Sequence, residues 1–452
     1  MHIIIAGDGK VGSTLLRLLS AEEHDLTLID TNQKQLEATV EQQDVMAVRG
    51  NCASMQVLLE AGVMDADLLI AVTGEDEINL LSCITAHGLN PKLHTIARIR
   101  DPEYTDQIHK MRDLFGLSMT VNPEKQAAKE IERLLKYPGF LRRDQFAKGR
   151  AEIVELRLNA QSKLCNVSLM EMSSIVKCKV LVCAVLRAGT AVAPRGNFVL
   201  REGDRIFVTA PTADLTLLLK NLGIITKKVR DVMLCGGGRV SYYLADLLEK
   251  DNISVKLLER NYERCVELAE LLPETSIIHA DCSNQGILDD QGIRSCDALV
   301  TLTGTDETNM VISLYGGSCN VGTIITKLSR GENSSIADSM NLGSLISPRE
   351  LCCNHIVRYV RAMQNQTGAA VSVHAIADGQ AEAVEFLVDK STKNCGIPLK
   401  QMKLKPNVLL ASIIHGTTTE IPAGDSTFME GDTIVVVTSG RGVLRSINDI
   451  FA

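Results

Sequence analysis

Residues 3–12 read IIIAGDGKVG, and residues 232–241 read VMLCGGGRVS. In each stretch a short apolar run leads into a glycine-rich segment, and an amphipathic pattern follows it, over 12–20 in the first copy. A strand, a tight turn and a helix in this order open a doubly wound α/β domain. The two stretches lie 229 residues apart, so the chain carries this unit twice.

The match between the two halves continues along the chain. Residues 66–81 (ADLLIAVTGEDEINLL) align with residues 296–311 (CDALVTLTGTDETNMV), and residues 194–208 align with 422–436. A near-constant offset over this length indicates a duplicated pair of domains rather than a short repeat. We predict an α/β fold with two Rossmann-like, doubly wound parallel sheets, each followed by a small α+β domain.

The domain boundaries follow from this division. The front domains with their parallel sheets, and the back domains with their linkers, are expected in the order 1–138, 139–228, 229–363 and 364–452. The basic stretch 141–148 marks the first linker, and residues 364–370 mark the second.

Composition excludes several classes of protein. The 452 residues include 47 Lys and Arg against 55 Asp and Glu, a net charge of −8, which argues against a protein that coats nucleic acid. Aromatic residues are only 3% and Trp is absent, so base stacking is disfavoured as well. The 13 cysteines form no CxxC pair, and no signal peptide or membrane-spanning segment is evident. These features predict a protein of the reducing cytoplasm.

The first glycine-rich segment matches a dinucleotide fingerprint in spacing and context. Gly7 permits the tight turn, Gly9 lets the backbone approach a pyrophosphate, and Gly12 lets the helix pack closely on the strand. Asp30 ends the next apolar run, 18 residues after Gly12, where an acid accepts hydrogen bonds from ribose hydroxyls and repels a 2′-phosphate. The competing interpretation is a turn that the scaffold retains without a ligand.

The second segment departs from the fingerprint at one place. Gly236, Gly238 and Glu259 keep their positions, but Ser241 replaces the third glycine. A side chain there is expected to crowd the helix against the strand and to weaken nucleotide binding, so the sequence leaves a functional second site open.

Catalytic signatures are missing from the sequence. A dehydrogenase needs a substrate domain and a proton-transfer residue near the nicotinamide. The nine histidines occupy no equivalent places in the two halves, and the sequence has no nucleophile elbow, P-loop lysine or HExxH motif. We therefore predict no catalytic residues and no metal site.

Segment 50–86 resembles the middle of an RCK/KTN domain, and the EGD[RT]I[FV]V motif occurs twice, at 202–208 and 430–436. Two such domains in tandem, each followed by a TrkA-C-type domain, resemble the TrkA family of peripheral subunits of bacterial and archaeal Trk potassium uptake systems. The resemblance covers essentially the whole chain.

The resemblance implies a nucleotide sensor rather than an enzyme. Such a subunit binds ATP, ADP or NAD(H) and gates a membrane-embedded Trk-type potassium channel from the inner face of the cell membrane. It also implies a homotetrameric ring, in which four chains supply eight RCK-like units, and no nucleic-acid partner. Subunits are expected to meet near 80–83 and 310–314, unless these are ordinary core helices.

Transferred by position, the resemblance implies a set of nucleotide-binding residues in each half. In the first half they are Gly7, Asp8, Gly9, Lys10, Val11, Gly12, Asp30, Asn51, Cys52, Thr73, Gly74 and Arg98. In the second half they are Gly236, Gly238, Arg239, Val240, Glu259, Asp281, Cys282, Thr303 and Lys327.

Simpler interpretations compete with these assignments. Alternatively, Lys10 and Arg98 are solvated surface charges and Asn51 caps a turn. Likewise, the next helix would be capped by Asp76, Glu77 and Asn79. For the whole protein, the alternatives are an NAD-dependent oxidoreductase, or a nucleotide-binding scaffold for another transporter or a cation–proton antiporter.

Overall fold

The computed structural model describes residues 1–112, 114–160, 162–222, 228–329, 340, 342–363, 370–377, 379–439, 444 and 446–452. The linker predicted at 364–370 therefore lies outside the described residues, apart from Ala370. Within the described ranges, no helix combines the length and the apolar character needed to cross a membrane.

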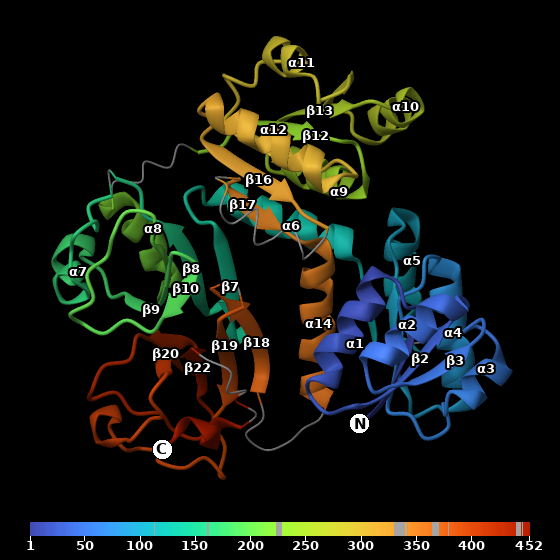
Figure 1. The fold of residues 1–452 in the computed structure, drawn as a ribbon, viewed down its shortest axis with the longest axis horizontal. Helices are drawn as coiled ribbons and strands as arrows, with labels where there is room; N and C mark the ends of the chain where they lie inside the picture. Colours follow the sequence, from blue (N-terminus) through green and yellow to red (C-terminus); the bar gives the residue numbers. More distant parts are fainter. Residues whose placement is uncertain are drawn as a thin grey trace. The chain divides into compact units, whose positions relative to one another are not determined.

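The first front domain is a six-stranded parallel sheet in the order β3-β2-β1-β4-β5-β6 (Figure 1). Residues 3–6 of its central strand have no exposed surface, as expected where helices cover both faces of a parallel sheet. The strands are β1 (His2–Ala6), β2 (Asp25–Asp30), β3 (Met46–Arg49), β4 (Leu68–Ala71), β5 (His94–Arg98) and β6 (Met119–Val121). The helices are α1 (Lys10–Ser20), α2 (Gln33–Gln42), α3 (Met55–Glu60), α4 (Asp76–Leu89), α5 (Pro102–Met111) and α6 (Pro123–Lys136).

The second front domain repeats this topology as β14-β13-β12-β15-β16-β17, with every pairing parallel. Its strands are β12 (Asp231–Cys235), β13 (Ser254–Glu259), β14 (Ser276–His279), β15 (Ala298–Thr301), β16 (Thr323–Lys327) and β17 (Ser344–Ile346). Its helices are α9 (Arg239–Lys250), α10 (Tyr262–Leu271), α11 (Gln285–Asp290), α12 (Asp306–Ser318) and α14 (Pro348–Met363). The predicted duplication of a Rossmann-like sheet is confirmed.

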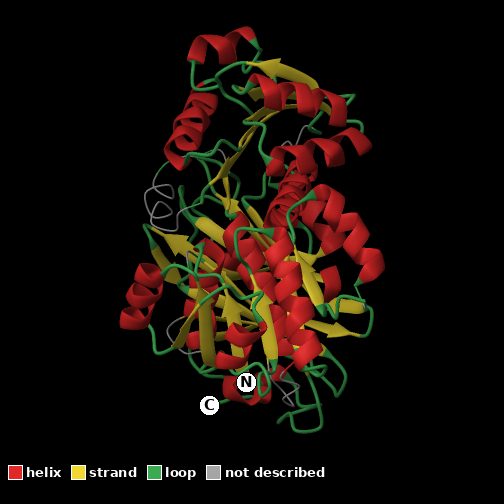
Figure 2. Cartoon of the chain, turned by 90° about the vertical axis from the view of Figure 1, so that its right-hand side faces the viewer, coloured by secondary structure: helices red, strands yellow, loops and turns green. Residues whose placement is uncertain are grey.

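Each back domain is built on a five-stranded antiparallel sheet. The strands of the whole chain are yellow in Figure 2. The first has the order β10-β9-β11-β8-β7 and comprises β7 (Arg142–Phe146), β8 (Ala151–Arg157), β9 (Leu181–Arg187), β10 (Thr190–Val192), β11 (Arg205–Pro211), α7 (Leu169–Val176) and α8 (Thr212–Asn221). The second has the order β18-β19-β22-β20-β21 and comprises β18 (Ala370–Ile376), β19 (Ala381–Leu387), β20 (Val408–His415), β21 (Thr418–Glu420) and β22 (Thr433–Ser439). Short 3₁₀ turns, η3 (Leu399–Gln401) and η4 (Ile447–Ile450), accompany the second sheet.

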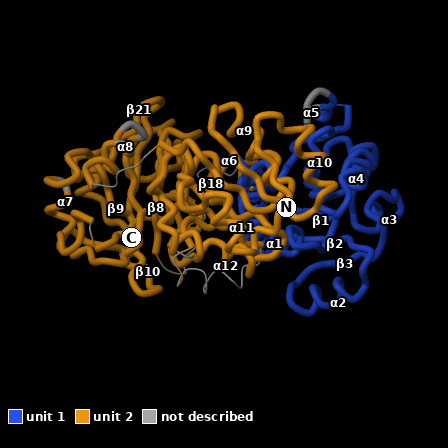
Figure 3. The backbone as a smooth tube through the Cα atoms, turned by 90° about the horizontal axis from the view of Figure 1, so that it is seen from above, with its two compact units in different colours: residues 1–129, 347–360 blue, residues 130–346, 361–452 orange. Residues whose placement is uncertain are grey.

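The chain forms two compact units, and each unit combines two segments that are separate in the sequence (Figure 3). Unit 1 contains residues 1–129 and 347–360, so most of α14 from the second half belongs to the first front domain. Cys352, Cys353 and Ile356 of α14 have no exposed surface, and the Cys353 Sγ lies 3.7 Å from the carbonyl oxygen of Val11 in α1. A helix of the second half thus completes the core of the first.

Unit 2 contains the remaining residues, including the end of α6. The Lys136 Nζ in that end lies 2.8 Å from a carboxylate oxygen of Asp251, just after α9. The four domain boundaries expected from the sequence stay a prediction.

The two antiparallel sheets share one apolar core within unit 2. Phe146, Ile153 and Phe207 of the first sheet cluster with Ala411 and Val435 of the second, and all five are buried. Polar groups also meet between the two sheets, where the buried hydroxyl oxygens of Thr209 and Ser412 lie 3.0 Å apart.

The buried carboxylate of Asp144 also connects the two sheets, through a charged group. An oxygen of Asp144 in β7 lies 2.9 Å from the Nδ1 of His374 in β18, and the other lies 2.8 Å from the Nε of Arg142. Burial alone raises the pKa of Asp144, but the charge of Arg142 and the hydrogen bond with His374 outweigh it and hold this pKa well below its usual range.

We expect Asp144→Ala to lower the free energy of unfolding by about 3 kcal/mol, the low end for a broken buried pair, because Arg142 keeps partial contact with solvent. Asp144→Asn should cost less, since an amide oxygen still accepts a hydrogen bond. Because the pKa of Asp144 is depressed, its contribution is complete above the ordinary aspartate pKa of about 4 and is lost progressively as the pH falls from there toward the lower pKa of the folded state, so the loss in Asp144→Ala should be smaller at pH 3 than at pH 7. Denaturant unfolding at pH 7 and pH 3 measures both effects; equal losses for Asp144→Ala at the two pH values would contradict the assignment.

Candidate functional site

The three glycines of the first loop have different structural roles. Gly7 has a φ of 105°, and a Cβ there would lie 3.0 Å from the Cα of Thr73. A Cβ at Gly12 would lie 1.8 Å from the carbonyl oxygen of Gly7. A Cβ at Gly9 would meet nothing within 4 Å. Glycine at positions 7 and 12 therefore serves the packing of the fold, whereas glycine at position 9 leaves open space above the loop.

The open loop leads into the N-terminus of α1. This helix begins at Lys10, and Gly9 at its N-cap provides no side-chain cap. Helix N-termini carry unpaired N–H groups and a partial positive charge, which suits them to phosphate. Lys10 is exposed beside this end, whereas Val11 is buried under it.

An acid at the end of the second strand orders each loop. Asp30 accepts hydrogen bonds from the backbone N–H groups of Asp8 (2.7 Å) and Asn32 (2.8 Å). Glu259 does the same for Gly237 (2.6 Å) and Asn261 (2.7 Å). A carboxylate has further lone pairs after two such bonds, so both acids can still accept bonds from ribose hydroxyls.

The ends of β4 and β5 are tied together by Asn79, which the sequence analysis assigned to helix capping. Its Oδ1 accepts from the backbone N–H and the hydroxyl of Thr73, both at 2.8 Å, and its Nδ2 donates to the carbonyl of Arg98 at 2.9 Å. No side chain caps α4. Asn309 repeats these bonds in the second half, so an asparagine at the same place in both halves was the available signal.

Arg98 is not a solvated surface charge. Its guanidinium donates to the carbonyl oxygen of Thr73, and its Nε is buried without a partner among the described residues. Burial, and then the charge of Arg100, lower the pKa of Arg98. Lys327 occupies the equivalent place and donates to the carbonyl of Leu302 at 3.1 Å. Both cations therefore lie at the carboxyl ends of their strands, β5 and β16, on the side of the sheet where doubly wound folds bind ligands.

Two predicted site residues follow the third strand in each front domain, and the first lies in a turn while the second lies in the core. Asn51 and Asp281 are exposed, and each accepts a hydrogen bond at 2.9 Å from the N–H two residues later. Cys52 and Cys282 are buried in the apolar cores of their domains. Gly74 is exposed with open space above it, and Thr303 matches Thr73.

The second loop accommodates its extra side chain. The Ser241 Oγ donates to the carbonyl of Gly236, and the N–H of Gly236 bonds Leu258 at 2.8 Å, the same distance as from Gly7 to Ile29. Gly236 has a φ of 101°, and Gly238 faces open space like Gly9. The crowding expected from Ser241 therefore leaves the attachment of the loop to the sheet unchanged. Arg239 is exposed and Val240 is buried, as in the first half.

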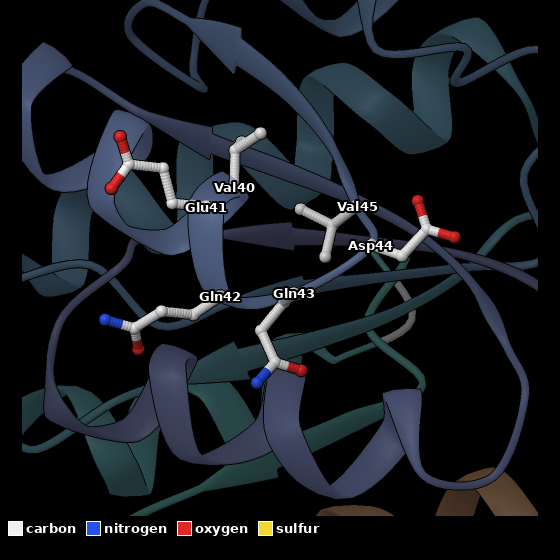
Figure 4. Close-up of a pocket in the computed structure, with 6 residues that line it drawn as sticks. All are labelled: Val40, Glu41, Gln42, Gln43, Asp44 and Val45. Carbon is white, nitrogen blue, oxygen red and sulfur yellow. The ribbon is translucent and has the colours of Figure 1, made fainter.

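Two hollows lie away from these loops. One, of about 330 Å³, is lined by six consecutive residues, 40–45, at the end of α2 (Figure 4). The other, of about 480 Å³, lies in unit 2 and has a mainly apolar lining that includes Met170, Val180 and Leu409, with Lys179 and Arg195 among its residues. The residues predicted to bind nucleotide line neither hollow, and the described chain contains no cluster of His, Cys, Asp and Glu suited to a metal ion.

The family model of the TrkA-N domain matches residues 3–123 and 232–348, and that of the TrkA-C domain matches residues 153–223. The Trk system potassium uptake protein TrkA homolog of Archaeoglobus fulgidus is 32% identical over 452 residues, which cover all of both chains. The chain belongs to the TrkA family. Another TrkA relative, the potassium uptake protein of Haemophilus influenzae, is 30% identical and is covered over 98% of its length.

Solved structures share the fold of this TrkA-family chain. The crystal structure of the GsuK RCK domain aligns with a TM-score of 0.62 over 97% of this chain and 92% of that one, at 17% identity. The GsuK channel bound to NAD aligns with a TM-score of 0.61 over 97% and 76%, also at 17% identity. At this identity the likeness concerns the fold alone.

Proposed function

We propose that this TrkA-family chain is a nucleotide-sensing regulatory subunit that binds adenine nucleotides or NAD(H) and gates a Trk-type potassium channel. The observation that carries the proposal is the pairing of an open loop at Gly9 with the Asp30 carboxylate, repeated at Gly238 and Glu259. Relatives named as Trk potassium uptake proteins support the ion, and structures titled as GsuK bound to NAD and to ADP support the ligand class.

The proposed role is regulatory rather than catalytic. This proposal is supported by the open loops and the carboxylates beside them, and by the names of the relatives, which describe uptake systems. We further propose that the chain works at the inner face of the cell membrane, with the four domains expected from the sequence. The membrane-embedded channel subunit is its proposed partner.

Unit 1 suggests how a ligand at the first loop would act on the second half. The phosphate loop continues into α1, whose Val11 contacts Cys353 of α14, and the side chain of Gln126 in α6 hydrogen bonds His355 of α14. A ligand shifts a conformational equilibrium only by its differential affinity for the two states. A coupling of about 1–3 kcal/mol, or 5- to 150-fold, is typical of such switches.

Apolar surface on two equivalent helices supports assembly into a ring. Leu81 and Ile84 on α4 are 50% and 36% exposed, and Val311 and Leu314 on α12 are 59% and 40% exposed. Exposed apolar groups at matching places of a duplicated chain fit interfaces with neighbouring copies. We propose that four chains form the ring through these faces.

We expect the double variant Leu81→Asp, Val311→Asp to shift the protein to a smaller species, because charges would replace apolar contacts at both proposed interfaces. Light scattering after size-exclusion chromatography measures the mass. The exposed Met46→Asp, outside these helices, is the matched control and should keep the wild-type mass. An unchanged mass in the double variant would remove α4 and α12 from the interface.

Calorimetric titration of the full chain with ATP, ADP and NADH tests the proposed function. We expect at least one of them to bind, with a stoichiometry near two per chain if the second loop is competent. Binding of none of the three would overturn the nucleotide-sensor proposal and favour the scaffold role. Steady oxidation of NADH with a small alcohol or acid would instead favour an oxidoreductase.

A further inference from the structure

The two loops differ at the residue between their first two glycines. Asp8 in the first loop corresponds to Gly237 in the second. Asp8 has no exposed surface, and its Oδ1 has no hydrogen-bond partner among the described residues. A buried, incompletely paired carboxylate is costly for the fold, so its position directly within a phosphate loop calls for a functional explanation.

Three neighbouring side chains surround Asp8. Thr39 in α2 donates its hydroxyl to the Oδ2 at 2.7 Å, and Gln35, also in α2, donates its Nε2 to the backbone carbonyl of Asp8. The charged neighbour is Asp30, whose carboxylate accepts from the N–H of Asp8. Burial raises the pKa of Asp8 despite the bond from Thr39, and the charge of Asp30 raises it further. The surroundings of the first loop thus place two carboxylates beside it, those of Asp8 and Asp30.

The second loop reverses this charge. Positions 35 and 39 correspond to Arg264 and Leu268 at the offset of 229 residues. Arg264 donates its Nε to the carbonyl of Gly237 at 2.8 Å, where the first half uses the neutral Gln35. A Cβ at Gly237 would lie 2.8 Å from the Cδ1 of Leu268, so an acid here would require the leucine side chain to move.

Two exposed acids near the second loop do not cancel the difference. Arg264 also pairs with Glu267 at 2.6 Å, but Glu267 is mostly exposed. Asp281, which replaces Asn51, is exposed as well. Exposed charges are screened by solvent and salt much more strongly than a buried carboxylate. Two further positions carry a cation in both halves. Lys10 corresponds to Arg239, and Arg98 corresponds to Lys327.

We propose that the two sites select ligands of different charge: the first takes a dinucleotide such as NAD(H), with little phosphate charge, and the second takes a nucleoside triphosphate or diphosphate. This inference rests on the proposed function, because it assigns ligands to the sites proposed there. One chain would then report two nucleotide pools at once.

Variants that keep one site each make the inference testable. Glu259→Ala leaves the first site and Asp30→Ala leaves the second, and each full-length variant is titrated with NADH and with ATP. We expect NADH to bind more tightly than ATP at the first site, and the reverse at the second. Asp8→Asn in the Glu259→Ala background should shift the ratio of the two affinities about tenfold toward ATP, because it removes the buried charge and keeps the shape.

Two further variants serve as matched controls. Arg264→Gln in the Asp30→Ala background should shift the ratio in the opposite direction. Gln35→Arg in the Glu259→Ala background should act like Asp8→Asn. If the melting curve of Asp8→Asn shows that this variant misfolds, Gln35→Arg takes its place. This inference alone would be overturned if both sites bound NADH and ATP with the same ratio of affinities. It would also be overturned if none of these substitutions changed that ratio. Failure of the wild-type chain to bind either nucleotide would overturn the proposed function itself.

Discussion

Asp30→Ala should weaken the binding of ATP, ADP and NADH at the first site by at least about 10- to 150-fold. A hydrogen bond to a charged group contributes about 1.5–3 kcal/mol, and this carboxylate is placed to accept from the ribose hydroxyls that all three ligands share. The loss should be larger than for one bond, because Asp30 also holds the N–H groups of Asp8 and Asn32. Calorimetry on the full chain measures it.

The duplicated chain provides the control for this prediction. Glu259→Ala removes the equivalent carboxylate and should leave the first site intact while it weakens the second. Asp30→Asn separates the two roles of the acid, since the amide oxygen keeps one acceptor but cannot serve two N–H groups and a ribose equally well. If Asp30→Ala and Glu259→Ala changed the same binding event, the assignment of one ligand to each loop would be wrong.

Much of this site could be predicted from the sequence because its parts are local. Gly7, Gly12 and Asp30 lie within one strand–turn–helix–strand unit, where spacing alone fixes the geometry. The fold class followed for the same reason, since each strand and helix carries its own apolar pattern. The duplication strengthened both predictions, because two copies rarely preserve a pattern by chance.

The parts that the sequence did not predict depend on contacts between distant residues. Asn79 sits at the start of a helix, where capping is its usual role, yet it joins the ends of two strands that are adjacent only in the folded sheet. The packing of α14 against the first front domain is a contact across more than half of the chain, and local periodicity carries no information about it. The acceptor that the Ser241 hydroxyl finds in the loop itself is another feature that the spacing of the glycines does not indicate, and the effect of Ser241 on nucleotide binding stays a prediction.

Gly9 and Gly12 have different surroundings in the structure, in line with the different roles that the fingerprint gives them, and this leads to the second large effect. Gly9→Ala places a methyl group in open space, so the fold should be unaffected and the melting temperature unchanged. The same methyl group would occupy the surface on which a pyrophosphate approaches the backbone, so nucleotide binding at the first site should be lost. Binding that survives in Gly9→Ala would place the phosphates elsewhere.

Gly12→Ala should behave in the opposite way. Its Cβ would lie 1.8 Å from the carbonyl oxygen of Gly7, and a backbone atom cannot move aside without shifting α1 against the sheet. Overpacking of this kind costs about 1–3 kcal/mol, so the melting temperature should fall even in the absence of nucleotide. Ser241 shows that this position can hold a side chain when its hydroxyl bonds the first glycine, so Gly12→Ser should recover part of the stability that Gly12→Ala loses. Thermal unfolding of the three variants decides between the two roles, because a ligand-facing glycine changes binding alone, whereas a packing glycine changes stability before any ligand is added.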